Sequence, residues 1–210
     1  MHLARLLEGH RKLTGAARLH QNATFPDGSS MGQVKGSTLL GTVKFLRSRR
    51  NEAVALLAPE HRHYLDDRIK STAWYPLEDL LTLVRACADL LGTGRGPSFE
   101  FMGEFAAKAH TETYGDLLKG AGSSSRVFAL WSTQFDVGRM HRVAEAPGRA
   151  RVELQEFKSP SPDLCHLIGG YIKGTLGMND VEDVVVEKLS CTTRSDPVCA
   201  WRASWKRGDD

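Results

Sequence analysis

Three of the four cysteines lie in the last forty-odd residues, where their spacing allows sulfur chemistry. Cys165 opens the run Cys-His-Leu-Ile-Gly-Gly, and seven residues separate Cys191 from Cys199. Thiolates are good zinc ligands, and structural zinc usually takes four protein ligands. Free thiols can instead be buried as small hydrophobic groups. A Cys191–Cys199 disulfide could cross a hairpin, although a reducing compartment disfavours it. Zinc, inert thiols and a disulfide all remain open.

A zinc site would need a fourth ligand, and the nearby candidates are Glu187, His166 and Asp196. Glu187 precedes Cys191 by four residues, which in a regular strand is about 13 Å. Both could reach one ion only if a bulge shortened that path. His166 follows Cys165 directly and would point elsewhere on a regular helix. Spacing alone therefore does not select the fourth ligand.

The elements around these cysteines form a short alternating pattern. Pro147-Gly148 joins two stretches, 140–146 and 149–157, which predicts a β-hairpin. A helix is expected over about 164–176, followed by a strand over 181–191 and its hairpin partner over 199–205. On that last strand Cys199 and Trp201 share a face. The order is β-β-α-β-β.

The first half of the chain is predicted to be helical. Ser37 is a suitable N-cap for a helix to about Arg49. Pro76 at a first helical position, followed by acidic residues, predicts another helix that ends near Gly92. Helices over about 98–118 and after Ser123 complete an α+β domain, with a helical N-terminal half packed on an antiparallel sheet. Residues 1–30 are expected to form an amphipathic helix and linker, and residues 31–207 the single domain.

Aromatic and methionine side chains recur at helical spacing in the two helices before the first hairpin. Such positions are ordinarily core. They could also form the wall of an apolar ligand pocket between two helices and the sheet, because ligand pockets are mostly apolar. The candidates are Phe101, Met102, Phe105, Phe128, Trp131 and Phe135.

Composition excludes several classes of protein. A length of 210 residues with 41% hydrophobic content indicates one globular domain with a real core. A formal charge of +3 without a clustered basic patch does not indicate a nucleic-acid binder. No apolar run reaches the roughly 20 residues needed for a membrane span, and the N-terminus lacks secretory features. We therefore expect a cytoplasmic protein. No catalytic constellation is present, so we expect no enzyme.

The C-terminal segment resembles the 4-vinyl reductase-type domain family. The resemblance lies in the run from Cys165 to Lys173-Gly174, in the strand that carries Glu187, and in Cys191 with Cys199 eight positions on. Ser195 replaces the glycine of the family's Gly-Asp-Pro turn. That family includes sensory domains of bacterial aromatic-responsive transcription activators and shares its fold with transport-protein-particle subunits. From Trp74 onward, the chain also resembles a bacterial paralogous family of about this length and unknown function.

The resemblance implies a zinc site, a ligand pocket and a role. In the aromatic-sensing members three cysteines and a glutamate bind zinc, which here implies Cys165, Cys191 and Cys199. The glutamate position of the family falls on Lys188, and Glu187 lies one residue away. The implied function is a non-enzymatic sensor for a small apolar or aromatic ligand, forming a homodimer and signalling to a partner protein. A ligand-free scaffold module of transport-particle type is one alternative. A reductase or accessory factor in tetrapyrrole synthesis is another.

Overall fold

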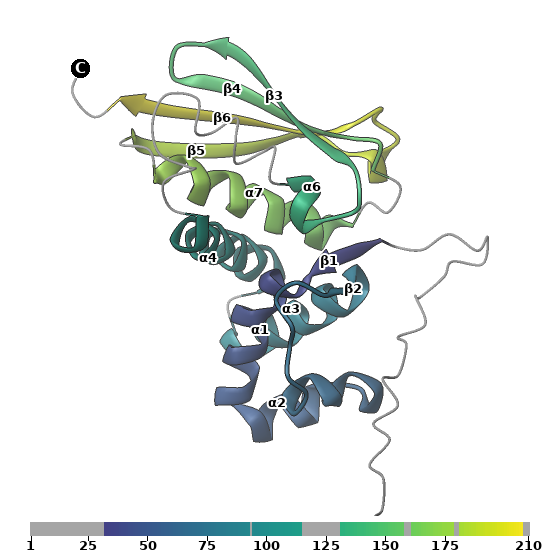
Figure 1. The fold of residues 1–210 in the computed structure, drawn as a ribbon. Helices are drawn as coiled ribbons and strands as arrows, with labels where there is room; N and C mark the ends of the chain where they lie inside the picture. Colours follow the sequence, from purple (N-terminus) through teal and green to yellow (C-terminus); the bar gives the residue numbers. More distant parts are fainter. Residues whose placement is uncertain (1–31, 93, 115–130, 158–160, 179–180, 208–210) are drawn as a thin grey trace, which may run out of the picture.

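The chain folds into a helical part and a four-stranded sheet, with one long helix between them (Figure 1). The computed structural model describes residues 32–92, 94–114, 131–157, 161–178 and 181–207. The expected helix and linker at residues 1–30, and Phe128, lie outside this part. The α+β class and the β-β-α-β-β order are confirmed.

The helical part contains α1, α2, a short 3₁₀ helix η1, and α3, and a two-stranded ribbon pairs β1 with β2. Their bounds are β1 Gln33–Lys35, α1 Gly36–Ser48, α2 Arg50–Leu56, η1 Pro59–Leu65, β2 Trp74–Pro76 and α3 Leu77–Leu91. The ribbon was not expected from the sequence. Ser37 is not an N-cap, because α1 already begins at Gly36; its hydroxyl instead donates to the Gln134 side chain at 2.6 Å.

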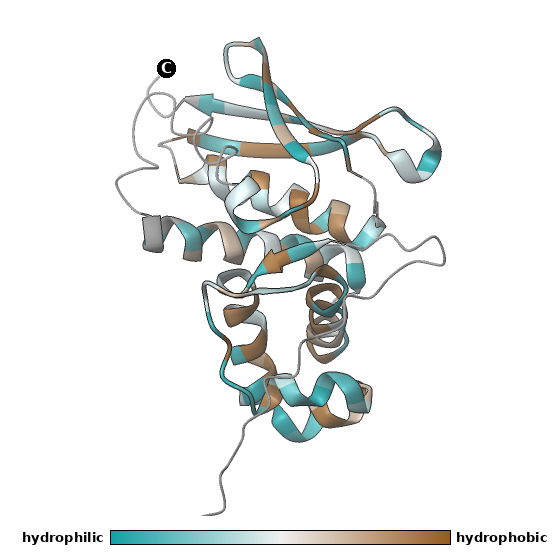
Figure 2. Ribbon diagram, turned by 45° about the vertical axis from the view of Figure 1, so that its right-hand side comes forward, coloured by the Kyte–Doolittle hydropathy of each residue, from teal (hydrophilic) through white to brown (hydrophobic). Residues whose placement is uncertain are grey.

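The residues at the two ends of helix α3 explain where it begins and ends. Pro76 precedes it, and Glu78 and Asp79 occupy its first turn, where carboxylates favour the positive end of the helix dipole. Gly92 ends the helix with a φ of +67°, a left-handed conformation that glycine adopts without strain. The apolar face of α3 turns toward the interior of the helical part (Figure 2).

Helix α4, Arg95–Tyr114, crosses α7, Pro162–Gly177, at very short range. A Cβ built on Gly103 would lie 2.0 Å from the Leu167 carbonyl oxygen. A Cβ built on Gly170 would lie 1.9 Å from the Glu100 carbonyl oxygen. Only glycine therefore allows the two backbones to meet at these two points.

The sheet has the strand order β3-β4-β6-β5 and is antiparallel throughout. Its strands are β3 Arg139–Ala146, β4 Arg149–Gln155, β5 Val181–Ser190 and β6 Cys199–Arg207. Helix α7 covers one face, and α4 packs on the other side of α7 (Figure 1). In β4 the buried residues alternate as Ala150, Val152 and Leu154. The α7 layer therefore contacts both the sheet and the helical part.

No helix in the described part of the chain is long and apolar enough to cross a membrane.

His110 is a buried histidine on α4 that makes stability depend on pH. Its Nδ1 lies 3.0 Å from the Tyr171 hydroxyl on α7, and burial lowers its pKa to about 4. As the pH falls, this histidine is protonated in the unfolded chain, where its pKa is near 6.5, before it is protonated in the folded chain. Stability is therefore complete above about pH 6.5 and falls as the pH drops toward 4.

We expect a loss of about 2 kcal/mol from this residue between pH 7 and pH 5. Urea unfolding of the wild type and of His110→Gln at both pH values measures it. Other groups contribute equally to both proteins, so the wild type should lose more stability than the variant. An identical pH dependence in the two proteins would show that His110 has no such role.

Candidate functional site

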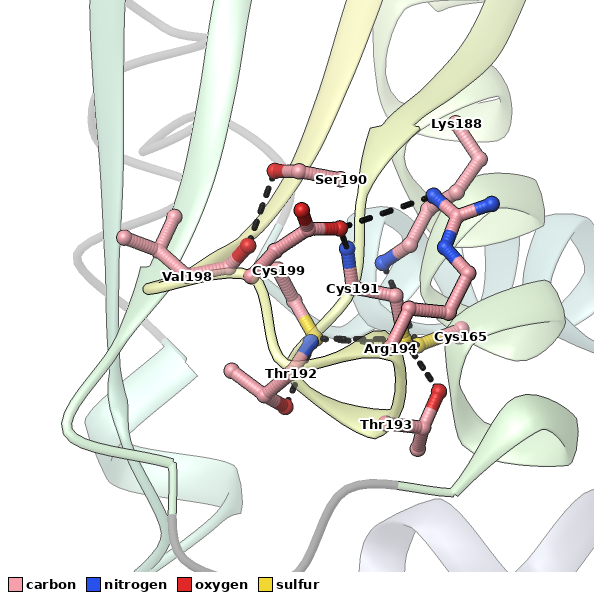
Figure 3. A network of polar contacts seen from close by, with 10 residues as sticks. Cys165, Lys188, Ser190, Cys191, Thr192, Thr193, Arg194, Val198 and Cys199 are labelled. Carbon is pink, nitrogen blue, oxygen red and sulfur yellow. Dashed lines mark hydrogen bonds and ion pairs between the residues drawn. The ribbon is translucent and has the colours of Figure 1, made fainter.

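Three thiols converge at the point where α7 meets the β5–β6 hairpin (Figure 3). Cys165 lies in the first turns of α7, Cys191 directly follows β5, and Cys199 opens β6. The Sγ–Sγ distances are 3.7 Å for Cys165–Cys191, 3.9 Å for Cys165–Cys199 and 3.7 Å for Cys191–Cys199. Cys165 and Cys191 are 7% and 6% exposed, and Cys199 is fully buried. The structure thus brings together the three cysteines that were candidate ligands in the sequence.

The hairpin is held in place by its own polar groups. The Asp196 carboxylate accepts from the Cys191 backbone N–H at 2.7 Å, and the Ser190 hydroxyl donates to the Val198 carbonyl at 2.8 Å. The short 3₁₀ helix η3, Thr192–Arg194, ends at Ser195 with a φ of +67°. Ser195 thus adopts the left-handed conformation at the position where the resemblance expects glycine.

Lys188 completes the cluster. Its Nζ lies 3.1 Å from the Cys165 Sγ and 3.4 Å from the ring centroid of Trp201. A cation over an indole face and beside a sulfur atom is stabilised by both. Glu187 is exposed, and alternation along β5 places its side chain on the opposite face from Lys188. The cluster of potential ligands among the described residues contains the three cysteines and not Glu187.

The Cys165 and Cys199 thiols shift each other's pKa values in opposite directions. A hydrogen bond from Cys165 lowers the pKa of Cys199, Thr192 and Lys188 lower it further, and burial opposes them. The same hydrogen bond, followed by burial, raises the pKa of Cys165, although Lys188 opposes this. Of the two thiols, Cys199 is therefore the one whose surroundings favour loss of the proton.

A cavity of about 340 Å³ opens beside the cluster. One face of α7, with Gly169 and Gly170, forms a wall of this cavity, and Glu100 of α4 adds to the lining. Cys165, Cys191 and Trp201 also line it. Its remaining charged or titratable lining residues are His166, Lys173, Lys188 and Arg194. This volume is at the lower end of the range for small-molecule pockets.

The expected apolar set does not line this cavity. Phe101 and Phe105 are 57% and 47% exposed and line an open groove of about 880 Å³ between α4, α7 and β5. Met102 is buried beside a small cavity of about 30 Å³. Trp131 and Phe135 are buried and stacked on each other, 3.9 Å between ring centroids. The structure thus distributes the described members over three places.

The sequence reasoning missed two main contributors, Lys188 and Trp201. Alternation along the strand gives a usable indication, because Val186 and Lys188 must lie on one face of β5. The register pairs Lys188 with Trp201 across the hairpin. A lysine on the thiol-bearing face was therefore predictable, whereas its contact with Cys165 depends on where α7 docks.

Comparison with known proteins identifies the fold. No family model and no curated protein matches the chain. Among solved structures, an H-NOX protein from S. oneidensis in the Fe(II)NO ligation state matches with a TM-score of 0.61 at 10% identity. The match covers 82% of this chain and 99% of that one. An oxygen-binding H-NOX domain related to soluble guanylate cyclases matches with a TM-score of 0.55 at 13% identity, covering 82% of this chain and 95% of that one.

A third structure, from work on heme distortion in the H-NOX family, matches with a TM-score of 0.57 at 14% identity, over 82% of this chain and 95% of the other. The chain therefore has the fold of H-NOX domains. The resemblance to the 4-vinyl reductase-type family and the transport-particle fold is wrong, because the matched structures are H-NOX domains.

The zinc expectation is corrected by the same finding, since the structures that share this fold are described with Fe(II) or heme. The geometry gives a physical reason. The ammonium of Lys188 stands beside the sulfur atoms, where a fourth ligand would have to bind, and Glu187 faces away. A cation beside the thiols opposes a second cation among them.

The described residues do not fit a heme either. A heme needs a slot for the macrocycle and an axial ligand such as histidine, cysteine, methionine or tyrosine facing it. His110 is the one buried histidine of the described part, and it borders a cavity of only about 30 Å³. The 880 Å³ groove offers Met178 as the one ligand of these types in its lining, but it is an open surface groove and not a slot that encloses a macrocycle. Residues 115–130 contain none of these four residue types.

The cavity at the thiol cluster is lined by Cys165, Cys191 and His166, but its volume of about 340 Å³ is at the lower end of the range for small-molecule pockets and does not suit a macrocycle. Lys188 in addition contacts the Cys165 sulfur. Chain expressed with added hemin is accordingly expected to show no Soret absorption. Elemental analysis should find less than about 0.1 zinc or iron per chain, because the described residues hold no complete ligand set. One equivalent of either metal in protein never exposed to chelator would contradict this expectation. It would show that a metal ion can displace the Lys188 ammonium from the thiols.

Proposed function

We propose that this chain is a non-enzymatic sensory domain that binds a small organic anion in the cavity beside the thiol cluster and signals to a partner protein. The observation that carries this proposal is the cavity itself, with its volume of about 340 Å³ and its mixed lining of cations, thiols and an indole ring. A concave site with a few convergent polar groups is the usual form of a small-molecule site.

The charges around the cavity favour an anion. Lys173, Lys188 and Arg194 line it, against the single carboxylate of Glu100. Lys173 pairs with Glu104 at 2.8 Å, and Arg194 lies 3.7 Å from Asp196. Lys188 contacts a sulfur atom and a ring face rather than a carboxylate. Its ammonium is therefore the group best placed to bind the charged end of a ligand.

The remaining lining favours a flat apolar body. Trp201 and Val186 of the sheet line the cavity together with Gly169 of α7. A small aromatic carboxylate has both the charge and the shape that this lining complements, which retains the aromatic ligand expected from the sequence.

The matched H-NOX structures support small-molecule binding by this fold. They are described with nitric oxide at Fe(II) and with oxygen. We carry over the binding of a small molecule, but not the heme, because the described residues do not fit one. The proposal places the domain in the cytoplasm, where free thiols stay reduced.

A homodimer is part of the proposal. Phe101 and Phe105 on α4 are exposed large hydrophobic residues, with exposed fractions of 57% and 47%, and both line the open groove. Exposed apolar groups near one groove are typical of protein interfaces. Sedimentation velocity of the wild type should show a dimer that Phe101→Ser with Phe105→Ser converts to monomer. A wild-type monomer at all concentrations would remove the dimer from the proposal.

The proposed binding is tested with benzoate as the probe and benzyl alcohol as its neutral counterpart. Isothermal titration calorimetry should show benzoate binding at least about tenfold more tightly, since a charge-assisted hydrogen bond contributes roughly 1.5–3 kcal/mol. Native mass spectrometry of freshly purified protein provides a second measurement, in which a retained small molecule is expected. The absence of both benzoate binding and a retained molecule would favour the alternative of a ligand-free scaffold module. The tetrapyrrole reductase alternative rested on the rejected resemblance alone.

A further inference from the structure

The three-thiol cluster also has the geometry for a reaction between its own sulfur atoms. Two of its sulfur atoms, on Cys165 and Cys191, line the cavity, whereas Cys199 lies behind them with no exposed surface. Each pair of sulfur atoms is 3.7–3.9 Å apart. A disulfide bond of about 2.05 Å requires each pair to close by roughly 1.7 Å, which side-chain rotation and a small shift of the turn can supply.

We propose that this cluster is a thiol-oxidation site at which a hydroperoxide converts Cys165 and Cys191 to a disulfide. The Cys165 sulfur passes its proton to the Cys199 sulfur, 3.9 Å away, and attacks the peroxide oxygen, so that an S–O bond forms and the O–O bond breaks. The leaving oxygen takes a proton and departs as alcohol, or as water from hydrogen peroxide. The Cys191 sulfur then displaces the hydroxyl of the sulfenic acid, the S–S bond forms, and water leaves. Two thiols lose two electrons, and the hydroperoxide accepts them.

Two features favour Cys165 as the sulfur that reacts first. It faces the cavity through which a small oxidant enters, and the Lys188 ammonium at 3.1 Å can stabilise the departing oxygen. Cys191 is the nearer of the other two thiols and also borders the cavity. A reactive cysteine with a resolving cysteine beside it is the usual arrangement of thiol redox sensors.

Cys199 supplies a third sulfur atom, to which the disulfide can move. The register that pairs Ser190 with Ala200 places Cys191 opposite Cys199 at the end of the hairpin. Its sulfur lies within 4 Å of both other sulfur atoms and can attack the new disulfide. The disulfide would then join Cys191 to Cys199 within the hairpin and no longer to Cys165 on α7. Cys87 stands apart, fully buried on α3 with its Sγ 3.9 Å from the Thr42 carbonyl.

Quantitative thiol alkylation and peptide mapping test this proposal. Wild-type chain, which has four free cysteines, is treated with a few equivalents of hydrogen peroxide, alkylated in denaturant and digested. Two alkylatable thiols should remain, with an intramolecular disulfide within the cluster. Cys199→Ser should give the Cys165–Cys191 peptide pair. Cys87→Ala should lose two thiols to a cluster disulfide as the wild type does, leaving one alkylatable thiol.

Three results would overturn the proposal. One is four remaining thiols, and another is oxygen added to single cysteines without a disulfide. The third is a Cys165→Ser chain that consumes peroxide as fast as the wild type, because a fall of at least fivefold is expected. Circular dichroism of the serine variant confirms that it is folded before its rate is compared. These outcomes are independent of benzoate binding, so this proposal and the proposed function can fail separately.

Discussion

Replacing Gly170 with alanine is expected to destabilise the chain by about 3 kcal/mol or more, at the upper end of the range for overpacking a dense contact. The added Cβ would lie 1.9 Å from the Glu100 carbonyl oxygen and 2.6 Å from the carbonyl carbon. Both atoms belong to the backbone of α4, so a side-chain rotation cannot relieve the clash. The two helices must separate, and the core between them loses contacts.

Gly169 provides a matched control one residue away on the same helix. A Cβ there would meet only the Trp201 indole, at 3.6 Å, which is ordinary contact. Gly169→Ala should therefore be neutral or stabilise the chain by roughly 0.5–1 kcal/mol, because alanine favours the helix. Thermal unfolding should place the Gly170→Ala midpoint roughly 10 °C below the wild type. Equal midpoints for the two variants would show that α4 and α7 do not cross as described.

Replacing Lys188 with methionine is expected to weaken benzoate binding at least about tenfold, because it removes the charge-assisted hydrogen bond. Methionine retains an apolar stem of similar length, so packing against Trp201 should persist. Lys188 is the lining cation whose contacts are a sulfur and an aromatic ring rather than a carboxylate. Its loss therefore removes attraction for an anion without leaving a carboxylate unpaired.

Lys206→Met on β6 is the control for this change. Lys206 is exposed and pairs with Asp183 at 2.7 Å, and it does not line the cavity. Lys206 carries the same charge as Lys188 and lies in the same sheet. Replacing either lysine therefore lowers the general electrostatic attraction for an anion equally. Calorimetry should give wild-type affinity for Lys206→Met. An equal loss in both variants would mean that benzoate is attracted by net charge and not held by Lys188.

The sequence was sufficient for the α+β class and for the convergence of the three thiols, since both follow from short-range patterns. The Pro147-Gly148 turn and the alternation along the C-terminal strands determine the hairpins. Once Cys191 and Cys199 lie at the end of one hairpin, a helix that begins at Pro162 and packs on the sheet brings Cys165 to them.

The lining of the cavity was not predictable in the same way, because it depends on how close α4 and α7 approach. Gly103 and Gly170 set that approach, and their roles are visible only when the opposing carbonyl groups are known. Phe101 and Phe105 have helical spacing that resembles a buried face, yet they lie exposed on α4. Helical periodicity identifies a face, but it does not say which neighbour covers that face.

The zinc expectation depended on a family pattern at a position where this chain has lysine. The substitution reverses the local charge, because a carboxylate beside thiols favours a metal cation and an ammonium opposes it. Lys188 was therefore the informative residue in the sequence. Its chemistry, rather than the nearby Glu187, defines what the cluster can bind.

The central claim is that a small organic anion binds in the cavity beside the thiol cluster. Titration of isotopically labelled chain with benzoate, followed by NMR of the backbone amides, tests it most directly. We predict saturable shifts concentrated on the cavity walls, at residues 165–173, 186–194 and 201. Shifts confined to the groove of Phe101 and Phe105, or no saturable shift at all, would contradict it.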